Sequence, residues 1–460
     1  MDFNEQLRLF RERVGDRHAV ALILTGSGQT DTAALLLAAL QPQRVAFLLT
    51  PETRTFPERV AQQIDSSPDP NWLRKTARYT DINQVYRALR AIIEDWSDLP
   101  REQILVDLTG GTKMMSVGLA KAAYALDLDT IYIESDYQQN KPVPGTQRLI
   151  APPDPYEVFG DLEAEEAARA FNTHDYLSAA RIYADLARRV PEPDRTTYAA
   201  LEQLAIAYTQ WEAFDLQTAA QTLQHLLSKP LPGPFAAQAA ILEKQQAALA
   251  RLHQVTSALN VDKRKGHRSR QADIKRALAT LANLDDVLSL LGSLHANALH
   301  REAQLRYDIA ALLRYRCLEL MSQHRLATYG VWPAEPNLDP LKEARPNLDQ
   351  RYRDQEQALD FTERGLKPNH HGKYSAMTLL NSYMLLAALD DPLMRTVKPI
   401  DIHQRVSARN QSILAHGFRQ ISKDEYRDFV TVVEQLLDQF FAIGQRSRSD
   451  WEALYRFVTL

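Results

Sequence analysis

Arg409 and His416, in the segment ARNQSILAHGF, are two side chains whose types and spacing could do chemistry. If this segment is a helix, seven residues turn it by about 700°, so both side chains project from one face, two turns apart. Asn410 lies at the edge of that face, and Ile413 and Leu414 can anchor the helix. Arginine binds a phosphate and the charge that builds on it, and histidine moves protons near neutral pH. The pair favours phosphodiester chemistry; the alternative is a solvated face that carries both residues by chance.

Two glycine turns, TGSG and TGGTK, could hold an anion. Each follows a short apolar run and leads into a stretch with helical periodicity. Backbone N–H groups and a helix N-terminus attract phosphates, and Lys113 at the end of the second turn adds a point charge. Two hydroxyl-rich turns of this kind suit a ligand that carries several phosphates. The alternative is a pair of ordinary connections between strand and helix that bind nothing.

Neither turn matches a common nucleotide fingerprint. The stretch GSGQTD resembles G-x-G-x-x-G, but Asp31 stands where a dinucleotide-binding turn needs a small residue against the strand. The stretch GGTK lacks the spacing of a Walker A loop, G-x-x-x-x-G-K-[ST]. The sequence therefore argues against a dehydrogenase and against a P-loop ATPase.

The first 150 residues alternate between apolar strands and amphipathic helices. Asp81 is the expected N-cap of one of these helices. Because strands that alternate with helices form a parallel, doubly wound sheet, both glycine turns should lie at the carboxyl edge, where ligands of such sheets bind. The expected strands are 19–25, 44–50, 73–80, 103–109 and 129–135, with 146–150 as an edge strand, and the expected helices are 31–40, 56–65, 81–96 and 113–126.

A proline-rich break, APPDPYE, ends this region, and the chain beyond it is predicted to be helical. The predicted fold class is therefore an α/β Rossmann-like domain followed by an all-α region. Three segments there, 168–187, 205–227 and 298–320, share an aromatic residue, an Asp and an Ala at similar spacing. They resemble tetratricopeptide-type hairpins, although their irregular separation favours simple antiparallel helix pairs over a solenoid.

Composition excludes several classes of protein. With 54 basic and 58 acidic residues the net charge is −4, so contact with nucleic acid must come from local patches. Cys317 is the sole cysteine, which excludes an internal disulfide and a cysteine-based zinc site. The N-terminus has no apolar core typical of a secretory signal, and the most apolar run, 374–389, is too short and polar for a membrane span. We expect a cytoplasmic protein with no membrane contact.

Two further groups of residues have both a functional and a structural interpretation. His370 and His371 could bind a metal, but no clustered carboxylate or cysteine accompanies them, so a loop is favoured and no metal site is predicted. A cationic run could guide RNA, with a solvated loop as the favoured alternative. The run consists of Lys263, Arg264, Lys265, His267, Arg268 and Arg270.

Two motifs together carry a family resemblance. The stretch DLTGGTKMM, after a strand, resembles the signature of the CRISPR-associated Rossmann-fold (CARF) domain. The stretch RNQSILAHG resembles the R-x(4–6)-H motif of the HEPN ribonucleases, and residues 305–330 look like the first long HEPN helix. The order, CARF first and HEPN last, is similar to that of the accessory ribonucleases of type III CRISPR systems. The domains implied are a CARF domain at 1–152, a helical connecting region at 153–295 and a HEPN domain at 296–460.

The resemblance implies an activity in antiviral defence. A cyclic oligoadenylate, made by a CRISPR effector, binds across a dimer of CARF domains and allosterically activates a HEPN endoribonuclease that cuts single-stranded RNA. HEPN catalysis needs no metal or other cofactor, since the RNA 2′-hydroxyl attacks its own phosphate. The expected assembly is a homodimer without a stable complex with the effector. An even ring suits a two-fold axis, and the tetra-adenylate is favoured over the hexa-adenylate.

The resemblance also assigns roles to residues. Catalysis falls to Arg409 and His416, supported by Asn410. Ligand contact falls to Thr25, Gly26, Ser27, Gly28, Thr50, Thr109, Gly110, Gly111, Thr112 and Lys113. Two alternatives stay open: a CARF regulator or partner-binding protein without nuclease activity, and a CARF domain that degrades its own ring ligand.

Overall fold

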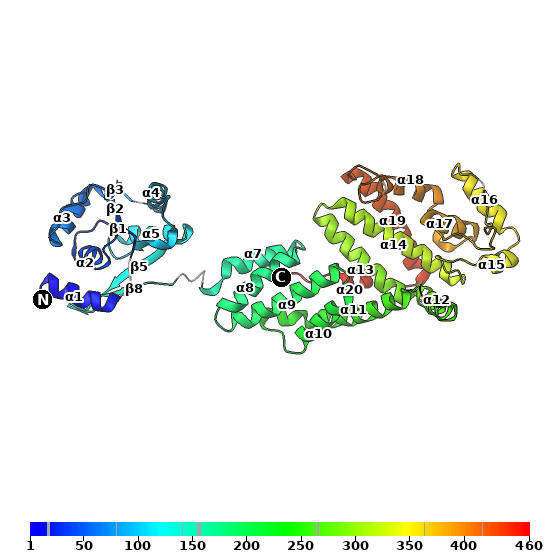
Figure 1. Ribbon diagram of the computed structural model, residues 1–460, viewed down its shortest axis with the longest axis horizontal. Coiled ribbons are helices and arrows are strands. Elements are labelled where there is room, and N and C mark those ends of the chain that lie inside the picture. Colours follow the sequence, from blue (N-terminus) through cyan, green and yellow to red (C-terminus); the bar gives the residue numbers. More distant parts are fainter. Residues whose placement is uncertain are drawn as a thin grey trace. The chain divides into compact units, whose positions relative to one another are not determined.

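The computed structural model describes residues 1–15, 19–79, 81–139, 141–153, 158–262, 264, 266–362, 364–415 and 417–460. It divides the chain into two compact units, Met1–Val158 and Phe159–Leu460, which are described separately (Figure 1).

The N-terminal unit is built on a six-stranded sheet in the order β3-β2-β1-β4-β5-β8. Neighbouring strands among the first five run parallel, and β8 pairs antiparallel with β5 at the edge. The elements are α1 (Phe3–Val14), β1 (Ala21–Thr25), α2 (Asp31–Leu40), β2 (Arg44–Leu49), η1 (Pro51–Thr53), α3 (Phe56–Gln63), β3 (Leu73–Thr76), α4 (Ile82–Asp95), η2 (Arg101–Gln103), β4 (Ile104–Asp107), α5 (Lys113–Ala125), β5 (Asp129–Glu134), β6 (Tyr137–Gln138), β7 (Lys141–Pro142) and β8 (Arg148–Ile150).

The three central strands β1, β2 and β4 each supply side chains to two cores, one on each face of the sheet. In β1, Leu22 and Leu24 pack with residues of α1, α2 and α3, whereas Ala21 and Ile23 pack with residues of α4 and α5. This division follows from the two-residue period of a strand, and it explains why the central strands read as continuous apolar runs. The predicted doubly wound α/β fold is confirmed (Figure 1).

The strand order places a topological switch point between β1 and β4. From β1 the chain winds outward to β2 and β3, and it then crosses to β4 and β5 on the other side. The connections that follow β1 and β4 therefore leave in opposite directions, and the crevice between them is where open α/β sheets bind ligands. Both glycine turns stand at this crevice.

Local signals set several of the element bounds. Asp81 caps α4 by accepting a hydrogen bond from the Gln84 amide at 2.9 Å, as predicted. Thr112 caps α5 in the same way, accepting from the Met115 amide at 3.3 Å. The expected strand 73–80 is shorter than predicted and ends at Thr76.

The C-terminal unit is helical, as predicted. Its elements are α7 (Asp161–Asn172), α8 (Tyr176–Arg189), α9 (Asp194–Glu212), α10 (Leu216–Leu227), η3 (Gly233–Gln238), α11 (Ala239–Leu259), α12 (His267–Ala282), α13 (Leu284–Ala303), α14 (Tyr307–Thr328), α15 (Asp339–Ala344), α16 (Leu348–Ala358), α17 (Leu379–Ala388), η4 (Pro392–Arg395), α18 (Pro399–Asn410), α19 (Lys423–Gly444) and α20 (Arg448–Tyr455).

The three similar sequence segments form three helical hairpins, α7–α8, α9–α10 and α13–α14. Each pair of helices is joined by three residues, and the middle residue of each turn has a positive φ: 64° at His174, 59° at Phe214 and 60° at Leu305. A left-handed residue at this place reverses the chain within one turn of helix. The common sequence pattern therefore corresponds to one repeated turn geometry.

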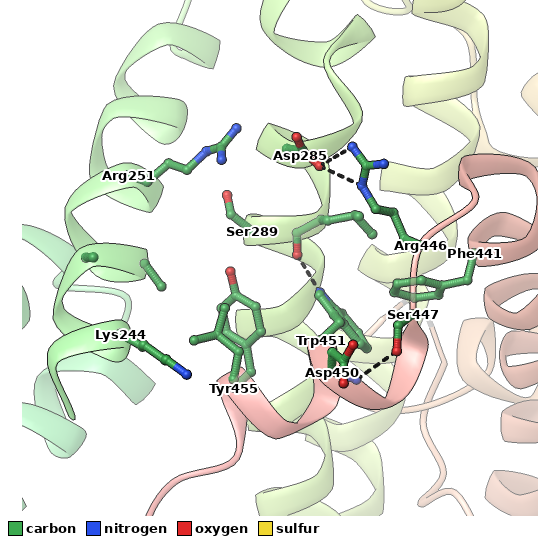
Figure 2. A pocket seen from close by; sticks show the side chains of 14 residues that line it. Lys244, Arg251, Asp285, Ser289, Phe441, Arg446, Ser447, Asp450, Trp451 and Tyr455 are labelled. Atoms are coloured by element: carbon green, nitrogen blue, oxygen red, sulfur yellow. Dashed lines mark hydrogen bonds and ion pairs between the residues drawn. The ribbon is translucent and has the colours of Figure 1, made fainter. Parts of the chain in front are cut away.

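A pocket of about 620 Å³ lies between α11, α13, the end of α19 and α20 (Figure 2). Both of its arginines are paired within the protein: Arg446 with Asp285 at 3.1 Å, and Arg251 with Asp286 at 2.8 Å. The Trp451 indole, which lines the pocket, donates a hydrogen bond to the Leu288 carbonyl at 2.8 Å and so connects α20 to α13. None of the predicted site residues lines this pocket.

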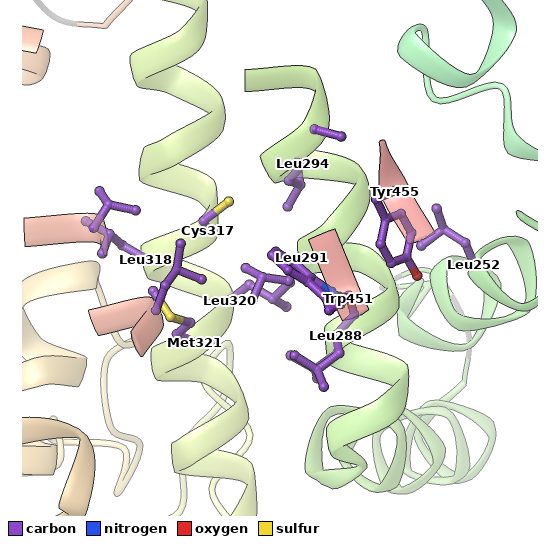
Figure 3. Packing of buried hydrophobic residues seen from close by; sticks show 14 of the residues in the cluster. Leu252, Leu288, Leu291, Leu294, Cys317, Leu318, Leu320, Met321, Trp451 and Tyr455 are labelled. Atoms are coloured by element: carbon purple, nitrogen blue, oxygen red, sulfur yellow. Dashed lines mark hydrogen bonds between the residues drawn. The ribbon is translucent and has the colours of Figure 1, made fainter. Parts of the chain in front are cut away.

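The core of the helical unit runs between α13, α14 and α20 (Figure 3). Leu291 and Leu320 meet Trp451 in its interior, and each of these side chains is buried. Cys317 of α14 is fully buried there, and burial raises the pKa of its thiol to about 12. The sole cysteine is therefore a packing residue with an unreactive thiol.

Within the most apolar run, 374–389, residues Leu379–Ala388 form the largely buried helix α17. Within the described residues, no single helix is both long and apolar enough to cross a membrane. Helices α12 and α13 meet that criterion only when joined, and they are bent by 77°.

Candidate functional site

The two glycine turns of the N-terminal unit pack against each other through Thr25. A Cβ added to Gly110 would lie 2.9 Å from both the carbonyl oxygen and the hydroxyl of Thr25. Gly111 has φ +83°, and a Cβ there would lie 3.1 Å from the same hydroxyl. Only glycine allows this approach with the observed backbone. The structure thus joins the β1 turn and the β4 turn into one surface at the switch point.

The first residues of the β1 turn are buried and therefore out of reach of a ligand. The Gly26 amide donates to the Leu48 carbonyl at 2.8 Å, and the Thr25 hydroxyl is buried with no partner among the described atoms. The Ser27 hydroxyl donates to the Gln29 carbonyl at 2.5 Å. Gly28 is exposed, and its carbonyl accepts from Arg59 at 2.6 Å. The exposed part of the turn, from Ser27 onward, is the part that a ligand can reach.

Thr109 has a role inside the protein. Its hydroxyl donates to Asp107 Oδ1 at 2.5 Å and accepts from the Ile133 amide at 2.8 Å, which ties the end of β4 to β5. Asp107 also accepts from the Thr109 amide at 2.9 Å. The Thr109 hydroxyl therefore already has both a donor and an acceptor as partners, and a ligand would meet the turn through its other groups.

Asp107 is a buried carboxyl group beneath the β4 turn that sequence reasoning did not select. It is 2% exposed, and burial raises its pKa to about 6, although the two hydrogen bonds from Thr109 oppose this shift. The signal in the sequence was an acidic residue at the end of an apolar strand, followed two positions later by threonine.

The first turn of α5 follows the β4 glycine turn directly and borders the surface that the two glycine turns form. Thr112 and Lys113 are both exposed, and Lys113 forms no ion pair with any residue that the structure describes. Ser116 donates to the Gly110 carbonyl at 3.1 Å and so fixes the turn on the helix. The unsatisfied amides of the helix end, its dipole and one free lysine make an electropositive place for phosphate.

Thr50 follows β2 on the other side of β1. Its amide donates to the Thr53 hydroxyl at 2.9 Å, as part of a capping box that opens η1. The same Thr53 hydroxyl would lie 2.6 Å from a Cβ on Gly26. The β2 connection thus packs under the β1 turn, with the half-exposed Thr50 at its edge.

In the helical unit, Arg409 occupies the last turn of α18. Its guanidinium carbon lies 4.1 Å from the centroid of the Tyr315 ring, on α14. Asn410 is exposed, and its amide oxygen is 3.4 Å from Arg409 Nη1. His416 lies outside the described residues.

The expectation that one helix continues from Arg409 through the residues that follow it is wrong, because α18 ends at Asn410. Residues 411–415 form turns, and the chain folds back so that the Gly417 amide donates to the Ser412 carbonyl at 3.1 Å. A Cβ on Gly417 would lie 1.8 Å from the Gln411 carbonyl oxygen, so this return depends on glycine.

The expectation that Ile413 and Leu414 anchor a helix is also wrong. Ile413 is 66% exposed, Leu414 47% and Phe418 97%. On α14, Leu312 lies one turn before Tyr315 and is 38% exposed. These exposed apolar side chains follow Arg409 in the sequence or precede its contact residue Tyr315, and exposed apolar groups of this kind are typical of interaction surfaces.

No group of three or more His, Cys, Asp or Glu side chains in the described part of the chain could hold a metal ion. His370 and His371 lie in a loop with their rings 3.9 Å apart.

The cationic run belongs partly to α12, which begins at His267, and two of its members, Lys263 and Lys265, lie outside the described residues. Arg264 pairs with Asp262 at 3.2 Å, and Arg270 pairs with Glu335. These pairs neutralise part of its charge.

Comparison with known proteins bears on both units. Residues 159–281 match the model of the Csm6 6H domain, and residues 279–439, which include Tyr315 and Arg409, match that of the Csm6 HEPN domain. The chain is 25% identical over 445 residues to the CRISPR system endoribonuclease Csm6 of Thermus thermophilus, covering 92% of this chain and 86% of the relative. A solved structure, Enterococcus italicus Csm6 bound to cyclic hexa-2′-fluoro-hexa-dAMP, aligns with 95% of this chain and 97% of its own, at 11% identity and a TM-score of 0.45.

Proposed function

Because the chain belongs to the CARF–HEPN accessory ribonucleases of type III CRISPR systems, we propose that it is a metal-independent endoribonuclease that cuts single-stranded RNA when a cyclic oligoadenylate binds its N-terminal unit. One observation carries the catalytic part. Arg409, inside the HEPN match, presents a guanidinium with no carboxylate partner among the described residues. Such a group is free to bind a phosphate.

In the proposed reaction, Arg409 binds the scissile phosphate and the negative charge that develops on it. The RNA 2′-hydroxyl attacks its own phosphorus, loses its proton to a base, and the 5′-oxygen leaves with a proton from an acid. His416 is the candidate for moving these protons, and Asn410 for holding the phosphate. The products are a 2′,3′-cyclic phosphate and a free 5′-hydroxyl.

We place this reaction at the interface of a homodimer. One arginine and one histidine are few groups for phosphodiester cleavage, whereas a two-fold axis brings two copies of each to one cleft. The exposed Ile413, Leu414 and Phe418 beside Arg409 support such an interface, since their burial between two chains would remove apolar surface from water.

The activator site is proposed at the joined glycine turns. The exposed end of the β1 turn, the α5 N-terminus and Lys113 suit the phosphates of a cyclic oligoadenylate. Two copies of this surface around a two-fold axis fit a ring with an even number of nucleotides, and the tetra-adenylate is favoured over the hexa-adenylate. The enzyme would act in the cytoplasm, without a stable complex with the effector.

The test is cleavage of a fluorescent single-stranded RNA by the full chain with a panel of cyclic oligoadenylates. Cleavage should require one ring, resist EDTA and leave 2′,3′-cyclic phosphate ends. Arg409→Ala and His416→Ala should each abolish cleavage at saturating ring. Arg405→Ala is the matched control, since Arg405 lies one turn earlier and contacts Asp401 of its own helix.

Three results would contradict the proposal: full activity in Arg409→Ala, dependence on a divalent metal, or cleavage that ignores every ring. Disappearance of the ring during the assay would add a ring-degrading activity. Ring binding without RNA cleavage would favour a regulator.

A further inference from the structure

We propose that Tyr315 is a positioning residue for catalysis, whose ring face holds the Arg409 guanidinium in place to receive the scissile phosphate. This inference rests on the proposed function. The distance of 4.1 Å from the guanidinium carbon to the ring centroid is within the range of a cation–π contact. Tyr315 lies on α14 and Arg409 at the end of α18, so the contact fixes one element against the other.

The chemistry of the contact suits a phosphate-binding arginine. A carboxylate partner would fix the guanidinium but would also occupy its N–H groups and neutralise its charge. An aromatic face supports the flat side of the guanidinium, so the N–H groups stay free in its plane for bidentate binding of phosphate. Tyr315 therefore orients Arg409 and leaves its charge available.

The acidic residue that follows Tyr315 on α14 has another arginine as its partner. Glu319, one turn beyond Tyr315, receives a hydrogen bond from Arg316 at 3.1 Å. Arg316 also donates to Gln323 at 3.2 Å. This chain of contacts holds Glu319 by another arginine, and among the described residues no carboxylate pairs with Arg409.

The position of Arg409 makes such support necessary. It stands in the last turn of a helix, where the chain leaves the helix for turns in which Gln411, Ile413 and Leu414 are exposed. A long side chain at a helix end has many rotamers, and each must be excluded before the phosphate binds. Packing against the half-buried Tyr315 ring restricts the Arg409 rotamers before the phosphate binds. Such preorganisation raises the rate of cleavage, because less side-chain entropy is lost in the reaction.

The test compares Tyr315→Leu with Tyr315→Phe in the full chain, with activating ring and fluorescent RNA. Tyr315→Leu should lower kcat/KM roughly three- to thirtyfold, mostly through kcat, where a tenfold loss is about 1.4 kcal/mol. Tyr315→Phe keeps the ring face and should stay close to wild type. Tyr307→Leu, on the same helix but with its ring packed at a tilt against Tyr426, centroids 5.2 Å apart, is the matched control.

A second measurement does not depend on cleavage. Arg409→Ala and Tyr315→Leu, made singly and together, should be non-additive by roughly two- to fivefold in the unfolding equilibrium constant. Additive effects, or a Tyr315→Leu enzyme with unchanged kcat, would overturn the inference, and so would Tyr315→Phe losing as much as Tyr315→Leu. If the wild type cleaves no RNA with any ring, the proposed function fails, and the coupling alone decides whether Tyr315 holds Arg409.

Discussion

Replacing Asp107 with asparagine should change how the stability of the N-terminal unit depends on pH. In the wild type, burial raises the pKa of this carboxyl group from 3.8 to about 6. The folded protein therefore binds this proton more tightly than the unfolded chain does. The resulting stability is fully present below pH 3.8, falls as the pH rises through this window, and is lost above about pH 6.

The size of the effect follows from the two pKa values. A difference of about two pKa units corresponds to about 3 kcal/mol in total. Between about pH 4.5 and about pH 7.5 the wild type should lose about 2 kcal/mol of this, or roughly thirtyfold in the opening equilibrium. Asparagine does not titrate, and its side-chain oxygen can still accept both hydrogen bonds from Thr109, so Asp107→Asn should lack this loss.

Amide hydrogen exchange of β4 and β5, read by mass spectrometry on the full chain, isolates the effect. Intrinsic exchange rates cancel when variant and wild type are compared at the same pH. Relative to wild type, protection of the two strands in Asp107→Asn should rise roughly thirtyfold from about pH 4.5 to about pH 7.5. A ratio that stays constant would refute the reasoning, because it would mean that Asp107 is ionised alike in the folded and unfolded states.

Three further predictions test other parts of the molecule. Lys113→Ala should weaken binding of the activating ring by about ten- to a hundredfold in calorimetry, with the maximal cleavage rate unchanged; the exposed Lys121 of the same helix gives the matched control Lys121→Ala, and equal affinities in both would move the site elsewhere. In a tagged heterodimer with His416→Ala in one chain, RNA cleavage should fall far below half of wild type, whereas half activity would mean that each chain cuts alone. Leu305→Gly should raise the free energy of unfolding of the full chain, measured in urea, by up to about 1 kcal/mol. Leu305 has φ 60°, which glycine adopts without strain, and it is 68% exposed, so little apolar burial is lost. The control Leu305→Ala keeps the Cβ and should give no gain.

The sheet was predictable because its signals are local. Continuous apolar runs marked the central strands, and Asp81 and Thr112 mark helix starts by their own side chains. The meeting of the glycine turns followed from the rule that parallel strands end at one edge. The internal use of Thr109 could not be predicted, since its second partner, Ile133, comes from a neighbouring strand.

The end of α18 at Asn410 differs from the prediction that the helix continues through residues 411–418. Ile413 and Leu414 have a spacing that suits a helix, yet periodicity does not show whether apolar side chains face a core or solvent. Asn410 and Gly417 were available as stop signals and outweigh that pattern in the structure. The turns at Phe214 and Leu305 could not be predicted for another reason, since neither residue type favours a positive φ.

The direction of β8 has a consequence for how a signal could leave the sensor. Because β8 runs antiparallel to β5, with Arg148 opposite Glu134 and Ile150 opposite Tyr132, the chain departs toward the amino edge of the sheet. The glycine turns stand at the carboxyl edge. The peptide that follows β8 therefore starts at the edge of the sheet opposite to the proposed ring site, so a ring at that site would not contact it directly. In the proposed mechanism, the effect of the ring would pass through the sheet or between the two chains of the proposed homodimer, so RNA cleavage should tolerate extra residues in the connecting peptide better than substitutions within the strands.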